Sequence, residues 1–344
     1  MSRPVEEGLA TYLSEKLGRS VAIENVSEAS AGARRRNVLF DALAGSERHE
    51  LVASITPSAA ILLMPTETET GALRIAEEFK VPVPHVHWVC TDERYVGGPF
   101  FISTRVSGET VPRRVLRLVE RESIGARLAG QIGEAFARLH GIPVERAPAG
   151  LILPDAVSAV ERALGAMRVQ LDSLWQPAPA LALGLGFLER NASRVAPRLA
   201  IVHGDLRNGN IIVDATGLRA VLDWEGAHLG DPMEDLARIC LRTWRFGADA
   251  HEVGGFAPRS ALVDAYVAAG GTFDSRAFHW WKVLGTLRWG IGLARQAIGH
   301  LDGSVPSIVM AASGRRVAEL EFDLLTLLGQ PRLRQPLSGQ REAE

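Results

Sequence analysis

The sequence has few of the residues that build disulfide-rich, metal-cluster or membrane-spanning proteins. Only two cysteines, Cys90 and Cys240, occur among 344 residues, so neither a disulfide framework nor a cysteine metal site is expected. No apolar run reaches the length of about 18 residues that a transmembrane helix needs. Residues 1–17 also lack the apolar segment of a signal peptide. These absences predict a protein of the reducing cytoplasm.

An excess of charge of either sign is also missing. The 38 basic and 40 acidic residues leave a formal net charge of −2. Bulk electrostatics therefore gives no reason to expect binding to nucleic acid or to an anionic membrane. The hydrophobic fraction of 47% and the length instead predict a globular chain with two lobes around a cleft.

Periodicity of the apolar residues divides the chain into a strand-rich part and a helical part. Five strand-like runs with one inserted helix come first, helical spacing dominates after about residue 120, and the last helix is expected over 309–328. A β-rich island with a hairpin interrupts the helices at 199–224. The sequence therefore predicts an α+β chain of the protein-kinase-like two-lobe fold. Residues 1–106 would form a small five-stranded antiparallel nucleotide-binding lobe, and residues 107–344 a larger helical lobe with the catalytic loop.

The candidate chemistry lies on a loop at 201–210 and just after the next hairpin. Phosphoryl transfer from ATP needs a carboxylate for the hydroxyl proton, oxygen ligands for Mg²⁺ and positive charge near the transferred group. Asp205 and Asn210 have the five-residue spacing of such a loop, and Asp223 follows the hairpin. We predict Asp205 and Arg207 as catalytic residues, and Asn210 and Asp223 as magnesium ligands. Each alone could be a turn or cap residue, but their joint spacing argues against that reading.

Three neighbouring polar residues are predicted to support this loop. His203 is expected to orient the loop backbone through hydrogen bonds. Asp231, followed by a proline and then Glu234, has the pattern of a helix N-cap with a capping box. Asp235 is expected to brace the catalytic loop from below.

The two motifs resemble those of a known family. His203–Val213 reads HGDLRNGNIIV, and Leu222–Pro232 reads LDWEGAHLGDP. Both are similar to the aminoglycoside phosphotransferase and choline kinase-like superfamily, in particular to the bacterial branch related to the kinase domain of some acyl-CoA dehydrogenases. The resemblance covers roughly residues 20–328 and implies the same base and the same two magnesium ligands. It also implies ATP and Mg²⁺ as cofactors.

Nucleotide contacts are expected in the first lobe. Residues 30–36 occupy the place of a glycine-rich loop, where backbone N–H groups and arginines can meet phosphates, although an exposed basic turn is the alternative. Glu69 is the expected partner of the phosphate-binding base, and backbone groups at the end of the fifth strand would read adenine. The predicted cofactor-binding residues are Gly32, Arg34, Arg35, Glu69, Ser103, Thr104 and Val106.

One position departs from the family pattern. Ser54 stands on the third strand where a lysine or arginine is expected, and no lysine is near it. Arg34, Arg35 or Arg48 could replace that base by reaching across. If none does, a nucleotide-binding pseudokinase with a regulatory role becomes the better hypothesis.

The acceptor is predicted less directly than the donor. Four tryptophans mark the helical part, and such a face is more typical of a core than of a site. No acidic excess is present there, which argues against a polycationic aminoglycoside. The expected acceptor is a small-molecule hydroxyl compound and, by the resemblance, a hydroxyacyl compound; an aminoglycoside or macrolide kinase is the alternative. The tryptophans are Trp244, Trp280, Trp281 and Trp289.

Overall fold

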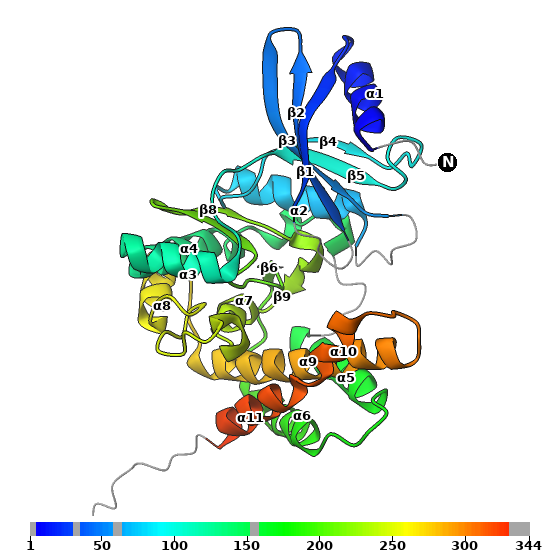
Figure 1. Cartoon of the computed structure of the whole chain (residues 1–344). Helices are drawn as coiled ribbons and strands as arrows, with labels where there is room; N and C mark the ends of the chain where they lie inside the picture. The colour runs from blue at the N-terminus through cyan, green and yellow to red at the C-terminus, as the bar shows by residue number, and fades with distance from the viewer. Residues whose placement is uncertain (1–4, 30–34, 58–63, 152–157, 330–344) are drawn as a thin grey trace, which may run out of the picture. The chain divides into compact units, whose positions relative to one another are not determined.

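A computed structural model of the chain describes residues 5–29, 35–57, 64–151 and 158–329 (Figure 1). The chain divides into two compact units. The first contains the sheet and the catalytic-loop segment, and the second contains helices only. The first unit comprises 1–156, 198–240 and 244–273, and the second 157–197, 241–243 and 274–344. The lobe boundary expected near residue 106 stays a prediction.

The expected five-stranded antiparallel sheet is confirmed. Its strand order is β1-β2-β3-β5-β4, and every neighbouring pair is antiparallel (Figure 1). In β2, Val38, Phe40 and Ala42 are buried, because alternate side chains of a strand point to the same face. The strands are β1 Ala22–Glu28, β2 Arg36–Ala44, β3 Glu47–Ile55, β4 Val86–Cys90 and β5 Phe100–Thr104.

Two helices pack with this sheet. α1, Val5–Leu17, contributes buried residues to the sheet core, where the Tyr12 ring meets Phe100 edge-on at 5.0 Å between centroids. α2, Thr66–Glu78, follows a proline and ends before the Val-Pro-Val-Pro segment, as the sequence predicts. The Glu69 side chain on α2 is buried, which places an acidic group beneath the strands.

The remainder of the first unit is helical with two small sheets. β7 and β8 form the hairpin that the sequence predicts, and β6 pairs with β9. Its elements are α3 Pro112–Glu122, α4 Gly125–His140, β6 Ala200–Val202, β7 Ile211–Asp214, β8 Gly217–Val221, β9 His228–Gly230, α7 Pro232–Ile239 and α8 Arg259–Ala268. α7 begins with Asp231 as its N-cap, whose carboxylate accepts the N–H of Met233 at 2.8 Å.

The second unit consists of α5 Ala159–Asp172, α6 Pro179–Asn191, α9 Ser275–Leu301, α10 Ile308–Gly314 and α11 Val317–Leu328. The sequence favours one helix over residues 309–328, and this is wrong. The helix ends at Gly314, a poor helix former whose missing Cβ would lie 2.6 Å from the Cβ of Ala297 on α9. Trp280 and Trp281 are buried core residues, as their helical spacing indicates.

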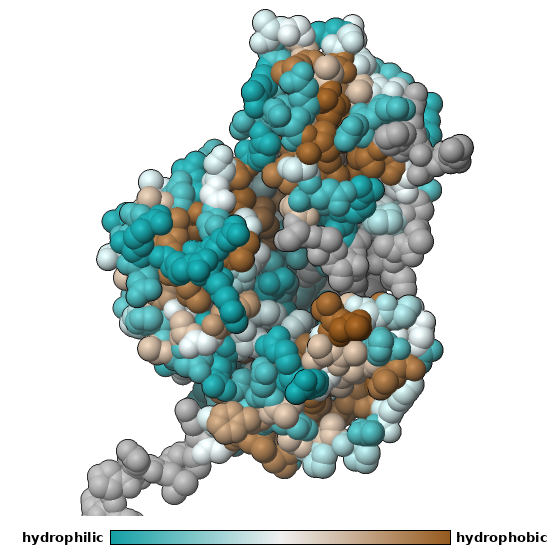
Figure 2. Space-filling model, viewed as in Figure 1, coloured by the Kyte–Doolittle hydropathy of each residue, from teal (hydrophilic) through white to brown (hydrophobic). Residues whose placement is uncertain are grey.

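Surface hydropathy of the second unit is uneven. Figure 2 shows apolar residues gathered over α10, where Ile308 and Val309 are 83% and 73% exposed. No helix in the part of the chain that the structure describes has the length and apolar character needed to cross a bilayer.

Candidate active site

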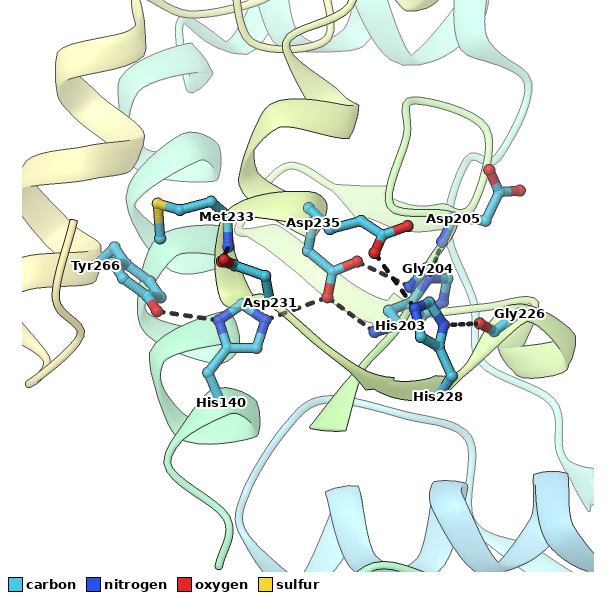
Figure 3. A network of polar contacts seen from close by, with 11 residues as sticks. His140, His203, Gly204, Asp205, Gly226, His228, Asp231, Met233, Asp235 and Tyr266 are labelled. Carbon is cyan, nitrogen blue, oxygen red and sulfur yellow. Dashed lines mark hydrogen bonds and ion pairs between the residues drawn. The ribbon is translucent and has the colours of Figure 1, made fainter. Parts of the chain in front are cut away.

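A buried carboxylate holds the start of the catalytic loop. Asp235 on α7 accepts the backbone N–H groups of His203 and Gly204, each at 2.8 Å, with its two oxygens (Figure 3). The ring of His140 lies 3.1 Å from the same carboxylate, and Tyr266 lies 3.0 Å from the other nitrogen of that ring. Because these bonds are shielded from water, they fix the loop backbone firmly. The predicted brace from Asp235 is confirmed.

His203 connects the loop to the segment after the hairpin. Its Nδ1 accepts the N–H of Asp205 at 3.1 Å, so its Nε2 carries the proton and donates to the carbonyl of Leu222 at 2.9 Å. Gly204 has φ +77°, and a Cβ there would lie 2.3 Å from the carbonyl oxygen of Gly226. The loop at 203–205 and the segment at 222–226 are therefore held against each other. The predicted role of His203 in orienting the loop backbone is confirmed.

The Asp205 carboxylate is held by four nitrogen donors from three side chains. Its Oδ1 accepts from Nε of Arg238 at 2.9 Å and from Nη2 of the same residue. Its Oδ2 accepts from Nδ2 of Asn210 at 2.8 Å and from Nε of Arg207 at 3.1 Å. Burial opposes ionisation, but the charges of Arg238 and Arg207 outweigh it and hold the pKa of Asp205 below its ordinary value. An ionised carboxylate in this position can accept a hydroxyl proton.

Asn210 and Asp223 offer oxygens to a hard cation. Asn210 uses its amide nitrogen on Asp205, which leaves its carbonyl oxygen for a ligand. Its backbone carbonyl accepts the N–H of Leu222 at 2.8 Å. This bond brings Asp223, the residue after Leu222, close to Asn210. The Asp223 side chain is exposed on a left-handed backbone with φ 66° and makes no hydrogen bond to the described residues.

This pair suits magnesium bound together with a nucleotide. Within the described ranges no group of three or more His, Cys, Asp or Glu could hold a metal without other ligands. Mg²⁺ is commonly held by one or two protein oxygens and completed by phosphates and water. Asn210 and Asp223 fit that donor set.

Arg35 lies beside Glu69, where the sequence did not determine which arginine would be found. Its guanidinium forms two parallel bonds with the Glu69 carboxylate, both at 2.7 Å, and both side chains are largely buried. Burial lowers the pKa of Arg35, but the bond to Glu69 outweighs it and the pKa is raised above its ordinary value. The carboxylates of Glu225 and Asp223 contribute to this rise, so Arg35 lies within electrostatic reach of the candidate metal ligand.

The other candidate bases are placed differently. Ser54 donates from its hydroxyl to Oδ1 of Asn37 on the paired strand at 2.8 Å. Arg48 lies 2.6 Å from the buried Asp41 carboxylate, which also binds Arg105. Gly32 and Arg34 lie outside the described residues. Of the two candidate arginines that the structure describes, Arg35 lies beside Glu69 and Arg48 does not.

The candidate adenine contacts lie at the end of β5. Ser103 is buried inside the sheet, paired with β3 on one side and β4 on the other. The Thr104 N–H donates to the carbonyl of His85 at 2.9 Å, and its hydroxyl lies 2.8 Å from the ring of His87. Val106 lies beyond the strand and is only partly buried. Among the three predicted residues, Val106 alone lies outside the strand pairing of β5.

Sequence reasoning missed two residues of the site, Arg238 and Trp244. The guanidinium carbons of Arg207 and Arg238 lie 4.9 and 5.4 Å from the centroid of the Trp244 ring. The helical spacing offered a signal for Arg238, because it follows Asp235 by three positions and a helix brings such residues to the same face. Trp244 is one of the four tryptophans that the sequence marks, but their pattern favoured a core, and its contact with the two arginines depends on the tertiary structure.

Comparison with known proteins agrees with this geometry. Residues 25–281 match the model of the phosphotransferase enzyme family. The chain belongs to that family. Acyl-CoA dehydrogenase family member 10 of Mus musculus is 27% identical over 199 residues, which is 55% of this chain and 17% of that protein. The chain therefore spans less than a fifth of the length of this curated relative.

Solved structures of this phosphotransferase family share the fold. A putative aminoglycoside phosphotransferase from Ralstonia eutropha has a TM-score of 0.70 and 20% identity, with 93% of this chain and 97% of that chain covered. A thermostable mutant of aminoglycoside phosphotransferase APH(4)-Ia, solved with ADP and hygromycin B, has a TM-score of 0.62 and 17% identity, with 92% and 98% covered. At these identities the likeness establishes the kinase-like fold.

Proposed function

We propose that this phosphotransferase is an ATP- and Mg²⁺-dependent O-phosphotransferase that acts on a hydroxyl group of a small molecule. The observation that carries the proposal is the ionised Asp205 carboxylate, held beside Asn210 and joined through the loop backbone to the segment of Asp223. Phosphoryl transfer needs little more from a protein than such positioning and charge. The two free cysteines, Cys90 and Cys240, fit a cytoplasmic location.

Asp205 and Arg207 would act on the reacting atoms. Asp205 accepts the proton of the acceptor hydroxyl while the acceptor oxygen forms its bond to the γ-phosphorus. The bond between that phosphorus and the β,γ-bridging oxygen breaks, and ADP leaves with the electron pair. Arg207 keeps its outer nitrogens for the transferred group, because only its Nε is bonded to Asp205. Mg²⁺ on Asn210 and Asp223 would neutralise charge on the phosphates.

The Arg35–Glu69 pair supports a catalytic function over that of a pseudokinase. Ser54 cannot meet a phosphate with positive charge, whereas Arg35 presents a buried guanidinium oriented by a bidentate carboxylate. Its Nε is buried without a hydrogen-bond partner among the described residues. A fixed cation of this kind is what the nucleotide phosphates require.

For the acceptor, we propose a hydroxyacyl compound, either as a thioester or as the free hydroxy acid. The mouse relative is named as a member of the acyl-CoA dehydrogenase family, which supports this class. The charge around Asp205 also supports it over an aminoglycoside, since two guanidiniums and one carboxylate would repel a polycation.

The test is ADP formation by the purified full chain with Mg·ATP across hydroxy acids, hydroxyacyl thioesters, aminoglycosides and macrolides. Asp205→Asn is the inactive reference, and Asp264→Asn, on an exposed part of α8, is the matched control. We expect turnover with a hydroxyacyl compound that is lost only in the first variant. Phosphorylation of an aminoglycoside with kcat/KM of about 10⁴ M⁻¹s⁻¹ or more would instead identify an antibiotic kinase. Nucleotide binding without turnover on any acceptor would favour the pseudokinase.

A further inference from the structure

Arg238 provides more positive charge at Asp205 than the carboxylate can neutralise. Asp205 carries one negative charge, while Arg207 and Arg238 each carry a positive one. The Arg238 side chain is 11% exposed, so its charge is poorly screened by water. Arg238 uses Nε and Nη2 on Asp205, and its Nη1 makes no hydrogen bond to a described residue. A donor-rich group with net positive charge therefore stands beside the candidate base.

The two oxygens of Asp205 separate the site into two sides. Oδ2 is bonded to Asn210 and Arg207, the residues proposed to serve the metal and the transferred phosphoryl group. Oδ1 is bonded to Arg238 and to no other described side chain. In the proposed reaction the acceptor hydroxyl lies against Asp205, so Arg238, which is bonded to the same carboxylate, is a neighbour of the acceptor.

Trp244 makes Arg238 a rigid recognition group. Its ring is buried and lies within 5.4 Å of both guanidinium carbons, so both arginines stack on one indole. Planar guanidiniums held in this way lose little entropy when they bind a carboxylate with two parallel hydrogen bonds.

We infer that Arg238 binds a carboxylate that the acceptor carries close to the hydroxyl to be phosphorylated, so that the acceptor class is the hydroxy acids in their free, ionised form. This inference rests on the proposed phosphotransferase function and narrows it. A hydroxyacyl thioester or ester has no charge at that position and would not engage Arg238.

The experiment compares matched acceptors in two arginine variants. The probes are 2-hydroxy, 3-hydroxy and 4-hydroxy acids, each with its methyl ester and its CoA thioester. Arg238→Met keeps the length of the side chain and its contact with Trp244 but removes the charge. Arg127→Met, on an exposed part of α4, is the control, and thermal melting verifies that each variant is folded.

We expect wild-type protein to prefer a hydroxy acid over its ester. Arg238→Met should lower kcat/KM for the acid by about 10- to 100-fold, the usual worth of a hydrogen bond to a charged group. Because Arg238 also holds Asp205, the same variant should change kcat/KM for the ester as well, but the loss with the acid should exceed that with the ester by about 10-fold or more, and Arg238→Lys should restore part of this difference. Arg127→Met should behave as wild type with every acceptor.

Other outcomes would overturn the inference. Equal losses with acid and ester in Arg238→Met would show that Arg238 only positions Asp205. Equal gains in kcat/KM with acid and ester would show that Arg238 only weakens Asp205 as a base. Turnover of neutral alcohols with no preference for the acids would remove the inference and leave the proposed function intact.

A binding measurement separates this inference from the failure of the proposed function. Calorimetric titration of the hydroxy acids needs no transfer step. Binding that is present in wild-type protein and lost in Arg238→Met would support the anion site even if no acceptor were phosphorylated. Absence of both binding and acid-dependent turnover would disprove the inference that Arg238 binds the carboxylate of the acceptor.

Discussion

The candidate catalytic loop and the Arg35–Glu69 pair are held in place to very different degrees. Asp205 is fixed by three side chains, and the backbone before it is fixed by Asp235 and His203. Arg35 has fewer restraints, since among the described side chains it is hydrogen-bonded to Glu69 and lies over the Phe101 ring, 5.6 Å from its centroid. Residues that are held by many local contacts must occupy fixed positions in the sequence. A residue that only has to supply a positive charge can come from a different segment of the chain, as Arg35 would in place of a base at position 54.

The largest effect should follow from changing the base itself. Asp205→Asn removes the proton acceptor but keeps the size of the side chain, so we expect turnover to fall by about 10²- to 10⁴-fold. Binding of Mg·ATP should remain, because Asn210 and Asp223 are unchanged. Initial rates and equilibrium titration measure the two quantities. Near-normal turnover with the true acceptor would disprove the assignment of the base.

The brace below the loop should matter for stability. Asp235→Ala leaves two buried backbone N–H groups without an acceptor. We expect the free energy of unfolding to fall by about 2–5 kcal/mol. Urea denaturation measures it, with Asp264→Ala on exposed α8 as the control. A loss no larger than that of the control would mean that the loop is held by other contacts.

The two candidate metal ligands should differ in weight. Asp223→Ala removes a charge as well as an oxygen, whereas Asn210→Ala removes only a dipole. We expect Asp223→Ala to weaken Mg·ATP binding about 10-fold more than Asn210→Ala. Calorimetric titration of both variants decides the ranking, and equal or reversed losses contradict it.

The relocated base should show a smaller and more selective effect. Arg35→Ala should raise KM for ATP by about 10- to 100-fold, because a charged contact with the phosphates is lost. Arg36→Ala is the matched control, since its neighbouring guanidinium pairs with Glu28 on the exposed surface. Steady-state kinetics with varied ATP provide the measurement. Similar changes in both variants would argue that Arg35 does not reach the phosphates.

Much of the fold could be read from local pattern. Alternation predicted the five strands, and the Pro-containing segment after residue 80 predicted the end of α2. One exception was the helix expected over 309–328, which is interrupted after Gly314, a poor helix former that lies close to Ala297 on α9. Backbone propensity is a local property, whereas such a close approach depends on a neighbour distant in sequence.

The sequence by itself determined the catalytic loop, because Asp205, Asn210 and Asp223 lie on one loop and hairpin whose spacing sets their arrangement. It could not determine which arginine meets Glu69, since that depends on how β2 and α2 pack. Only the tertiary structure decided that Arg35 does so and that Arg48 binds Asp41 instead. The same holds for Arg238 and Trp244, because only the tertiary structure brings Arg238 to Asp205 and Trp244 to the two arginines. Charge interactions depend on distance in space, and sequence separation does not specify it.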